Sequence, residues 1–356
     1  MQKKIKIDHI AKIEGHAGFV ANIINGDIKS ARIEILEGAR LIEGLLIGRK
    51  YDEAPIITSR ICGICPIVHN ICSIKAMENA LTVKESQQTA LLRELLLYGQ
   101  ILQSHSLHLF LLCQDHEILS LRDWINTYLA ILGGRSIHPL TTMIGGFRKM
   151  PDAQKLAKLF ENYFDVLKIA LSLPLRFQKQ PEFFRKTEFK ALDRIYNGKI
   201  QELPEETQAG VVNRAKNIFM LGALARLHIY NYKDHNLKLP CYNTFYNLYA
   251  QVIEIVYYLE KIKELTPKKF KEKNIKYKIK AGKGIAGCEA PRGTLYHSYE
   301  IDKKGFIVKA KIVTPTAQFL NNLEADLKEY LKQDQSESGI KALIQAYDPC
   351  ISCATH

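Results

Sequence analysis

Apolar and polar residues alternate through the first part of the chain and again near its end. Residues 4–10 (KIKIDHI) and 18–36 (GFVANIINGDIKSARIEIL) place apolar side chains mostly at alternate positions, which is the period of a half-buried strand. Asn25, Gly26 and Asp27 are residues that tight hairpin turns favour. The pattern therefore predicts N-terminal strands with a hairpin turn at these residues. It predicts a second hairpin over residues 294–313, turning at residues 302–305 (DKKG).

Longer segments between these strands repeat apolar residues at intervals of three and four, the period of a helix. They predict long helices over residues 90–119, 153–173, 209–230 and 242–265. The first is apolar nearly all round, so we expect it at the centre of the protein. Neither an internal repeat nor a linker divides the chain. We therefore predict one domain over residues 1–356 with an α+β, predominantly α fold, in which a central bundle of long helices carries peripheral β-hairpins.

The composition narrows the class of protein. A chain of 356 residues, 47% of them hydrophobic, is long enough to bury a substantial core. Its most apolar stretch, residues 91–113, contains Arg93 and Glu94, whereas a membrane helix needs roughly 18–20 residues with few or no charges. The N-terminal segment alternates apolar with charged residues and lacks the continuous apolar region of a signal peptide. We predict a cytoplasmic protein without a membrane span.

The net charge of +13 is concentrated in one segment. Much of the excess lies in residues 267–284 (PKKFKEKNIKYKIKAGKG), and the rest is spread along predicted helices beside acidic residues. Tyrosine and phenylalanine interleave with these lysines, as they do in single-strand binders, but no nucleic-acid-binding motif accompanies them. A solvated lysine-rich segment is the favoured interpretation, docking onto an acidic protein is the alternative, and no nucleic-acid partner is expected.

Four of the eight cysteines form two CxxC pairs. Cys62 and Cys65 lie in RICGICPIVH, and Cys350 and Cys353 lie in DPCISCATH. Four thiolates suit a tetrahedral zinc or iron site. These pairs, however, stand near opposite ends of the chain, whereas zinc ribbons place them about 15–20 residues apart, and a protein of this size needs no metal staple. From the residues alone, a structural and a catalytic metal both remain open.

The two cysteine segments resemble the paired signatures of the [NiFe]-hydrogenase large subunit, RxCGxCxxxH and DPCxxCxxH. Further similar segments run along essentially the whole chain: KIEGH, GARLIEGLLIGR, MENAL, GGRSIHP, GGFRKMP, EAPRGTLYH and TPTAQ. In its TPTAQ segment and its short length, the chain is most similar to the cytoplasmic, cofactor-coupled branches of that family. The resemblance implies the family's fold and its activity, the reversible heterolytic cleavage of dihydrogen into protons and electrons.

The resemblance also implies a metal centre and roles for individual residues. All four cysteines would hold nickel, and Cys65 and Cys353 would also bridge to an iron that carries carbon monoxide and cyanide. Cys350 would accept the proton, Glu14 would be its next stop, and Arg292 would hang over the open metal face. A separate magnesium or iron ion would be bound by Glu43, by the backbone carbonyl of Ile312 and by His356. Groups expected to surround the centre without binding it are His69, Asp348, Pro315 and Thr316.

The other four cysteines show no spacing typical of an iron–sulfur cluster. The resemblance therefore implies an iron–sulfur small subunit as the electron-accepting partner, with further electron-transfer subunits beyond it. Two rival functions remain: a metal-free subunit derived from a hydrogenase, and a non-catalytic interaction protein stapled by zinc. Retention of all four cysteines and the final histidine argues against the first, and metal analysis separates the second.

Overall fold

The computed structural model describes residues 2–200, 203–209, 211–232, 235–271 and 274–356. Its helices are α1 Ile42–Leu46, α2 Ala54–Thr58, α3 Pro66–Leu81, α4 Gln87–Cys113, α5 His116–Gly133, α6 Ala153–Leu159, η1 Phe160–Asn162, α7 Tyr163–Phe177, α8 Ala223–Tyr230, η2 Thr244–Tyr246, α9 Asn247–Leu265, α10 Pro315–Tyr330, α11 Glu337–Tyr347 and α12 Ile351–Ala354. Its strands are β1 Gln2–Ile7, β2 Ala17–Ile24, β3 Asp27–Ile35, β4 Thr142–Met143, β5 Gly146–Phe147, β6 Glu188–Phe189, β7 Glu206–Ala209, β8 Val212–Ala215, β9 Phe219–Met220, β10 Gly282–Ala290, β11 Gly293–Ile301 and β12 Ile307–Val313.

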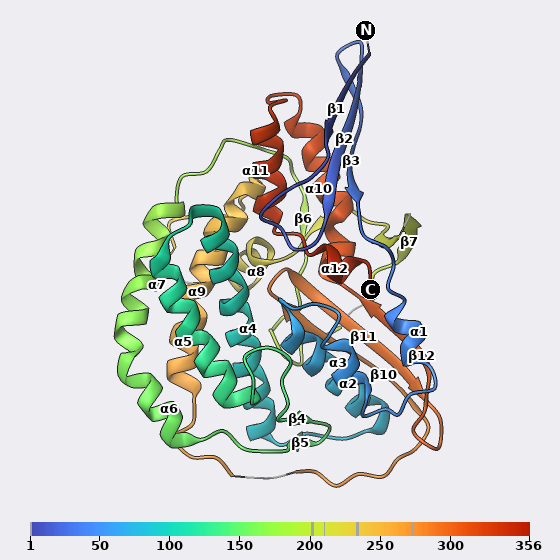
Figure 1. Ribbon diagram of the computed structural model, residues 1–356, viewed down its shortest axis with the longest axis vertical. Helices are drawn as coiled ribbons and strands as arrows, with labels where there is room; N and C mark the ends of the chain where they lie inside the picture. Colours follow the sequence, from blue (N-terminus) through green and yellow to red (C-terminus); the bar gives the residue numbers. More distant parts are fainter. Residues whose placement is uncertain (1, 201–202, 210, 233–234, 272–273) are drawn as a thin grey trace.

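The N-terminal segment forms the predicted strands. Strands β1, β2 and β3 make an antiparallel sheet in that order, which projects from one end of the molecule (Figure 1). The β2–β3 turn falls at Asn25 and Gly26, whose φ angles are 51° and 86°. Both turn residues of a tight type I′ hairpin need positive φ, which asparagine and glycine tolerate. The predicted hairpin is therefore present at these residues.

Helices α4, α5, α7 and α9 pack side by side as a bundle (Figure 1). Helix α4 lies between α5 and α9 and is buried on nearly all sides along residues 95–106. This burial explains its almost continuous apolar sequence. The predicted fold class is confirmed, and so is the central place of this helix.

The helix predicted over residues 90–119 is two helices. Gln114 adopts φ 55° and ends α4, and the Asp115 side chain accepts a hydrogen bond from the backbone N–H of Glu117 to begin α5. Apolar periodicity continues across this break, so the periodicity alone did not reveal it. The segment predicted as residues 153–173 is likewise divided into α6, η1 and α7.

The helix predicted over residues 209–230 is wrong in its first half. Only α8 is helical there; residue 210 lies outside the described part, and β8 and β9 precede the helix. The apolar residues of this half lie in and around two short strands, β8, which pairs with β7, and β9, which pairs with β6. Gly222, with φ 88°, separates the last strand from α8. Local periodicity could not distinguish these short strands from a continuing helix.

The predicted late hairpin is present as β11 and β12, and an additional strand, β10, pairs with β11. The sequence of β10, GKGIAGCEA, is too rich in glycine to resemble a strand. Its glycines permit close packing of α3 on the sheet (Figure 1). A Cβ added at Gly284 would lie 2.1 Å from the backbone oxygen of Ala76 in α3. This contact fixes the helix that directly follows Cys65.

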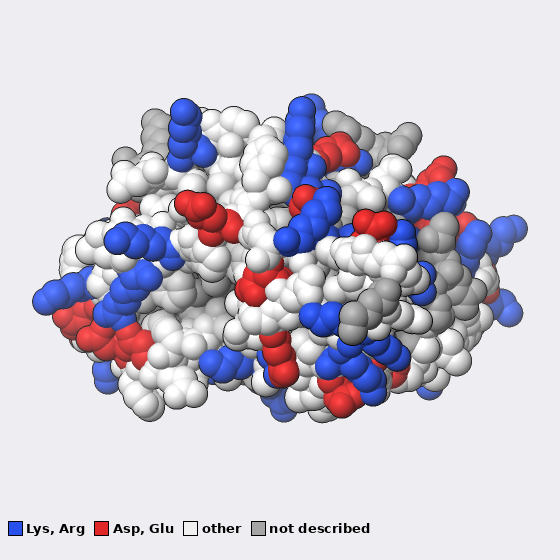
Figure 2. Space-filling model, turned by 90° about the horizontal axis from the view of Figure 1, so that it is seen from above, with Lys and Arg blue, Asp and Glu red and all other residues white. Residues whose placement is uncertain are grey.

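The buried apolar side chains form one cluster that includes the four cysteines of the CxxC pairs. On the face seen in Figure 2, basic side chains are scattered among acidic and uncharged ones and form no continuous patch. Within the described residues, no helix has both the length and the apolar character needed to cross a membrane.

Candidate metal centre

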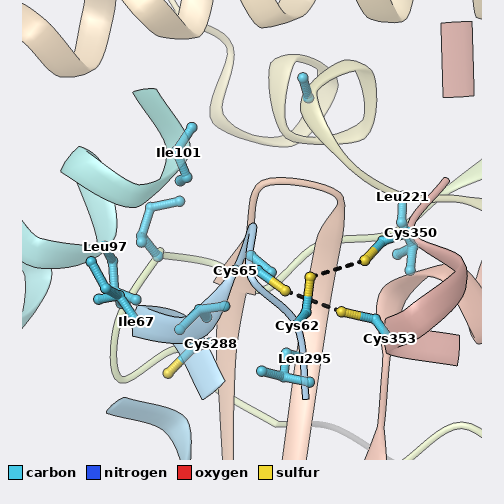
Figure 3. Close-up of a cluster of buried hydrophobic side chains, with 14 of the residues drawn as sticks. Cys62, Cys65, Ile67, Leu97, Ile101, Leu221, Cys288, Leu295, Cys350 and Cys353 are labelled. Carbon is cyan, nitrogen blue, oxygen red and sulfur yellow. Dashed lines mark hydrogen bonds between the residues drawn. The ribbon is translucent and has the colours of Figure 1, made fainter. Parts of the chain in front are cut away.

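The two CxxC pairs meet in the interior. Their four Sγ atoms lie within 4.8 Å of one another, and all four side chains are buried. The Sγ atoms of Cys62 and Cys350 are 3.3 Å apart, and those of Cys65 and Cys353 are 3.1 Å apart (Figure 3). The first pair lies between α2 and α3, and the second begins α12.

The cysteine thiols of this cluster differ in pKa. Hydrogen bonds from neighbouring sulfurs, chiefly Cys350, hold the pKa of Cys62 well below its ordinary value. Burial raises the pKa of Cys350 and of Cys353 well above it. A buried set of four sulfurs fits a soft metal ion, because the ion takes the place of the protons and stabilises all the thiolates at once.

Polar contacts align the two cysteine segments. The backbone N–H of Cys350 donates to Thr316 Oγ1 at 3.0 Å, and Thr316 follows Pro315 in the first turn of α10. Arg40 Nη2 donates to the carbonyl of Ile61 at 2.7 Å and also to the carbonyl of Ser352. Arg40 thus bridges the residues that directly precede Cys62 and Cys353. Arg40 was not among the predicted site residues, although it lies within GARLIEGLLIGR.

Glu14 lies against the second pair. Its Oε2 accepts hydrogen bonds from Cys350 Sγ and from the backbone N–H of Ser352, each at 3.0 Å. Its carbonyl accepts from the backbone N–H of Ile351 at 2.9 Å, and Glu14 and Cys350 form a parallel bridge. The backbone pairing therefore fixes the carboxylate beside the Cys350 sulfur.

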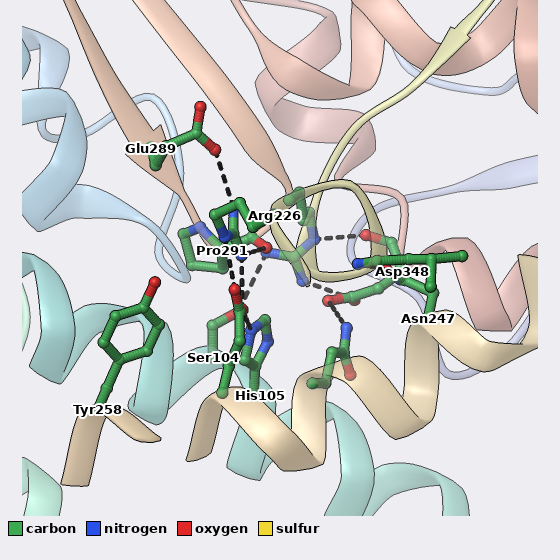
Figure 4. Close-up of polar contacts among 12 residues, drawn as sticks. Ser104, His105, Arg226, Asn247, Tyr258, Glu289, Pro291 and Asp348 are labelled. Atoms are coloured by element: carbon green, nitrogen blue, oxygen red, sulfur yellow. Dashed lines mark hydrogen bonds and ion pairs between the residues drawn. The ribbon is translucent and has the colours of Figure 1, made fainter. Parts of the chain in front are cut away.

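Arg292 occupies the buried turn between β10 and β11. Its Nη2 donates to Asp348 Oδ1 at 2.7 Å, and its Nη1 donates to Ser104 Oγ at 3.2 Å (Figure 4). Burial opposes the charge, but Asp348 and the cysteine sulfurs raise the pKa of Arg292 above its ordinary value. The guanidinium is therefore a fixed positive charge. A small cavity lies between this arginine and the cysteines; its lining includes Cys65, Arg292, Pro315, Thr316, Cys350 and Cys353.

His69 lies behind the cysteines. Its Nε2 is 3.7 Å from Cys353 Sγ, and its Nδ1 is 3.2 Å from Nε2 of His297. Burial lowers the pKa of His69 to about 3, so the ring is neutral at pH 7. His297 Nδ1 in turn lies 2.6 Å from the hydroxyl of Tyr299. His297 was not among the predicted site residues, even though it ends the segment EAPRGTLYH.

The last residue lies between two segments of the fold. His356 Nε2 is 3.0 Å from the carbonyl oxygen of Ile312 and 4.0 Å from Glu43 Oε1. His356 Nδ1 is 2.6 Å from the carbonyl oxygen of Cys353. Glu43 Oε1 also accepts from the backbone N–H of Ile312 at 2.7 Å. The structure therefore brings together all three groups predicted for the second ion site.

Comparisons with known proteins agree on one family. The model of the nickel-dependent hydrogenase family matches residues 40–115 and 240–356. Sulfhydrogenase 2 subunit alpha of Pyrococcus furiosus is 30% identical, with 99% of this chain and 98% of the relative covered. The NAD-reducing hydrogenase HoxS subunit beta of Cupriavidus necator is 24% identical, with coverage of 100% and 95%.

Solved structures agree with these sequence relatives. A chain of an NAD⁺-reducing [NiFe]-hydrogenase in the H₂-reduced state superimposes with a TM-score of 0.83 at 21% identity, and 99% of each chain is covered. The [NiFeSe]-hydrogenase of Dm. baculatum gives a TM-score of 0.78 at 20% identity, with 100% of each chain covered. The chain therefore belongs to the nickel-dependent hydrogenase family, and it is the catalytic large subunit of a [NiFe] hydrogenase.

Proposed function

We propose that Cys62, Cys65, Cys350 and Cys353 hold the nickel–iron centre at which this chain cleaves dihydrogen heterolytically and reversibly. The observation that carries the proposal is the convergence of four buried sulfurs within 4.8 Å beside a small cavity. When bound, the centre supplies the redox chemistry that separates dihydrogen into protons and electrons. The protein supplies the orientation of the ligands, a fixed charge and an exit for protons.

The proposed arrangement gives all four sulfurs to nickel and has Cys65 and Cys353 bridge to an iron. Both residues line the small cavity, together with Pro315 and Thr316. Carbon monoxide and cyanide on the iron would lie beside these residues. Ligands this small need little room, and the backbone and hydroxyl groups around them would tune the site without binding metal.

Cys350 and Glu14 are proposed to move the proton. The 3.0 Å contact between their sulfur and oxygen supports this, because proton transfer requires hydrogen-bond distance. Arg292 is proposed to act as the fixed charge above the cavity, held there by Asp348. His69 is proposed to orient Cys353 through its Nε2.

A second ion, magnesium or iron, is proposed at Glu43, the carbonyl of Ile312 and His356. Both ring nitrogens of His356 face carbonyl oxygens, but a neutral imidazole has only one N–H to donate. If Nδ1–H donates to the carbonyl of Cys353, then Nε2 has only a lone pair to present to the Ile312 carbonyl oxygen and to Glu43 Oε1. The lone pairs of these three atoms repel one another. A cation between them resolves this repulsion.

Electrons released at the centre are proposed to pass to an iron–sulfur small subunit in the cytoplasm, and from it to further electron-transfer subunits. Among the described residues, the four cysteines are the only group of three or more Cys, His, Asp or Glu side chains close enough to share one metal ion, so a partner subunit is proposed to carry the electrons onward. We also propose that residues 1–356 form one domain, which the single continuous core cluster supports. No nucleic acid takes part.

Metal analysis of the purified protein tests the centre. We expect nickel and iron, with about one nickel per chain as the four-thiolate set requires. Infrared spectra should show bands from carbon monoxide and cyanide bound to iron. Zinc alone, without such bands, would contradict the proposal and favour the zinc-stapled interaction protein.

A further inference from the structure

Arg226 of α8 is a fully buried arginine that does not contact the cysteines. Its Nε and Nη2 donate to the two oxygens of Glu254, each at 2.7 Å. Its Nη1 donates to Glu289 Oε2 at 3.0 Å and to the carbonyl of Ala290 at 2.7 Å. Its Nη2 also donates to the carbonyl of Pro291 at 2.9 Å. A guanidinium has five N–H donors, and these contacts use them all (Figure 4).

Two of those contacts hold the turn that carries Arg292. Ala290 and Gly293 are the last pair of the β10–β11 ladder, so Pro291 and Arg292 form a two-residue turn. Hairpin turns are usually solvated, but this one is buried. Its carbonyls therefore need donors from the protein. Arg226 supplies donors to two consecutive carbonyls, and thereby fixes the backbone directly before Arg292.

The residues before α8 pack against the same turn. A Cβ added at Gly222 would lie 3.3 Å from the carbonyl oxygen of Arg292, and one added at Gly293 would lie 2.5 Å from Leu221 Cβ. Both glycines have positive φ. The helix that carries Arg226 and the turn that carries Arg292 are thus in direct backbone contact, which leaves little room for either to shift alone.

Glu254 is itself held in place. Glu254 accepts from Tyr232 Oη at 2.9 Å, and its Oε2 lies 2.8 Å from His105 Nε2. Burial opposes its charge, but Arg226 lowers the pKa of Glu254 to about 2, so it is ionised at pH 7. The neighbour of His105 on α4 is Ser104, which contacts Arg292. One turn of α4 therefore touches both arginine networks (Figure 4).

We propose that Arg226 is a positioning residue that sets the place of the Arg292 guanidinium above the four cysteines by fixing the carbonyls of Ala290 and Pro291. The inference rests on the proposed role of Arg292. Arg226 touches neither cysteine nor cavity and acts only through the turn. Its loss would leave the metal ligands intact and displace the charge beside them.

The variant Arg226→Lys tests this. Lysine keeps the positive charge but presents its donors from one atom, so it cannot bind both oxygens of Glu254 and both carbonyls. We expect nickel and iron contents within about twofold of wild type, because no ligand changes. The carbon monoxide and cyanide bands should shift, and hydrogen exchange in a peptide covering residues 288–295 should accelerate at least about tenfold, as for the loss of one hydrogen bond. Turnover should fall by at least about tenfold, the cost of a displaced catalytic charge.

Arg93→Lys is the matched control. Arg93 is equally buried and also binds a carboxylate with two nitrogens, Glu78 at 2.8 and 2.7 Å, but it contacts Tyr196 and Met143 instead of the turn. The Arg93→Lys substitution should lower the melting temperature of the protein. It should leave the infrared bands and the hydrogen exchange of residues 288–295 unchanged. Equal band shifts in both variants would overturn the proposal, since they would reflect general loosening.

A double-mutant cycle separates positioning from a generally structural role. If Arg226 acts through Arg292, the doubly substituted Arg226→Lys, Arg292→Lys protein should be no less active than Arg292→Lys alone. Losses that multiply, or unchanged exchange in residues 288–295, would overturn the inference. Should Arg226→Lys fail to accumulate, Glu254→Gln removes one partner of Arg226 and should accelerate exchange in the same peptide. If wild type lacks nickel and iron, the proposed function fails, but exchange still decides whether Arg226 fixes the turn.

Discussion

Glu14 and Glu37 offer two carboxylates to the same terminal segment, but only Glu14 contacts a cysteine. Glu14→Gln should retain the fold and the metals, because an amide has nearly the same shape. Exchange of hydrogen with deuterium from solvent should fall by about 100-fold or more, because the amide cannot carry a proton at neutral pH. Mass spectrometry of the released gas measures this exchange.

Glu37→Gln is the control for that experiment. Glu37 accepts from the backbone N–H of His16 at 2.8 Å and from Ser352 Oγ at 3.4 Å. Its substitution alters the same neighbourhood without touching Cys350, so exchange should stay near wild type. Near-normal exchange in a fully metallated Glu14→Gln protein would assign the proton exit to another residue.

His356→Ala tests the second ion site. The substitution removes Nε2, which lies near Glu43 and the carbonyl of Ile312 and is one of the three proposed ligands. Because metal binding and folding are coupled, the segment with Cys350 and Cys353 should loosen. We expect lower nickel retention and faster proteolysis near the C-terminus, measured by metal analysis and by mass spectrometry of the fragments. His116→Ala, at an exposed histidine of α5, should do neither. Full nickel content and protease resistance in His356→Ala would contradict the proposal that an ion bound by His356 holds the terminal segment in place.

Spacing alone predicted only the four cysteines, whereas the other site residues were predicted from the resemblance to a known family. Two CxxC pairs indicate shared ligation wherever they lie in the fold, and the structure places them together. Arg40, Arg226 and His297 carry no such signal. Arg40 and Arg226 act largely through backbone carbonyls of distant residues, and which carbonyls a side chain meets depends on the tertiary fold alone.

At the scale of elements, the contact between α3 and β10 sets the position of the first cysteine pair. Gly284→Ala should destabilise the protein by about 1–3 kcal/mol or more, the cost of overpacking, because the added Cβ meets the backbone of α3 and not a flexible side chain. Urea unfolding measures the change. Gly44→Ala in α1 is the control: nothing lies within 4 Å of its added Cβ, so the free energy of unfolding should not fall. An equally stable Gly284→Ala protein would show that α3 can shift on the sheet.

Elements were predicted well where one period extends over many residues. Helix α9, the β11–β12 hairpin and α4 as far as Cys113 belong to this group. The structure differed where a single residue changes the conformation, as Gln114 does between α4 and α5. It differed again at β10, whose glycines serve close packing against α3 and weaken the alternation that would reveal a strand.

For the whole molecule, acid stability depends on buried and half-buried carboxylates. Burial opposes the charge of Glu85, but hydrogen bonds from Lys75 and Asn197 lower its pKa to about 2. An unfolded glutamate has a pKa of about 4.3. The ionised form therefore stabilises the fold above about pH 4.3, and this contribution is lost as the pH falls toward 2.

The difference in urea midpoint between wild type and Glu85→Gln should accordingly shrink as the pH falls from about 5 to about 2.5. Glu264→Gln, at an exposed residue of α9, should leave the pH profile of wild type unchanged. If wild type keeps its full difference in urea midpoint over Glu85→Gln at pH 2.5, the ionised carboxylate of Glu85 is not the form that stabilises the fold.

The candidate metal centre brings together two cysteine pairs whose partners lie 288 residues apart in the sequence. At synthesis rates of about 5–20 residues per second, the ribosome makes the second pair roughly 15 to 60 s after the first. During that interval the newly made chain contains Cys62 and Cys65 but not Cys350 and Cys353, so only two of the four thiols of the site are present. Zinc and copper ions bind such thiols readily. We therefore expect the cell to keep these ions away, or to deliver the intended metals first, until Cys350 and Cys353 are present to complete the site.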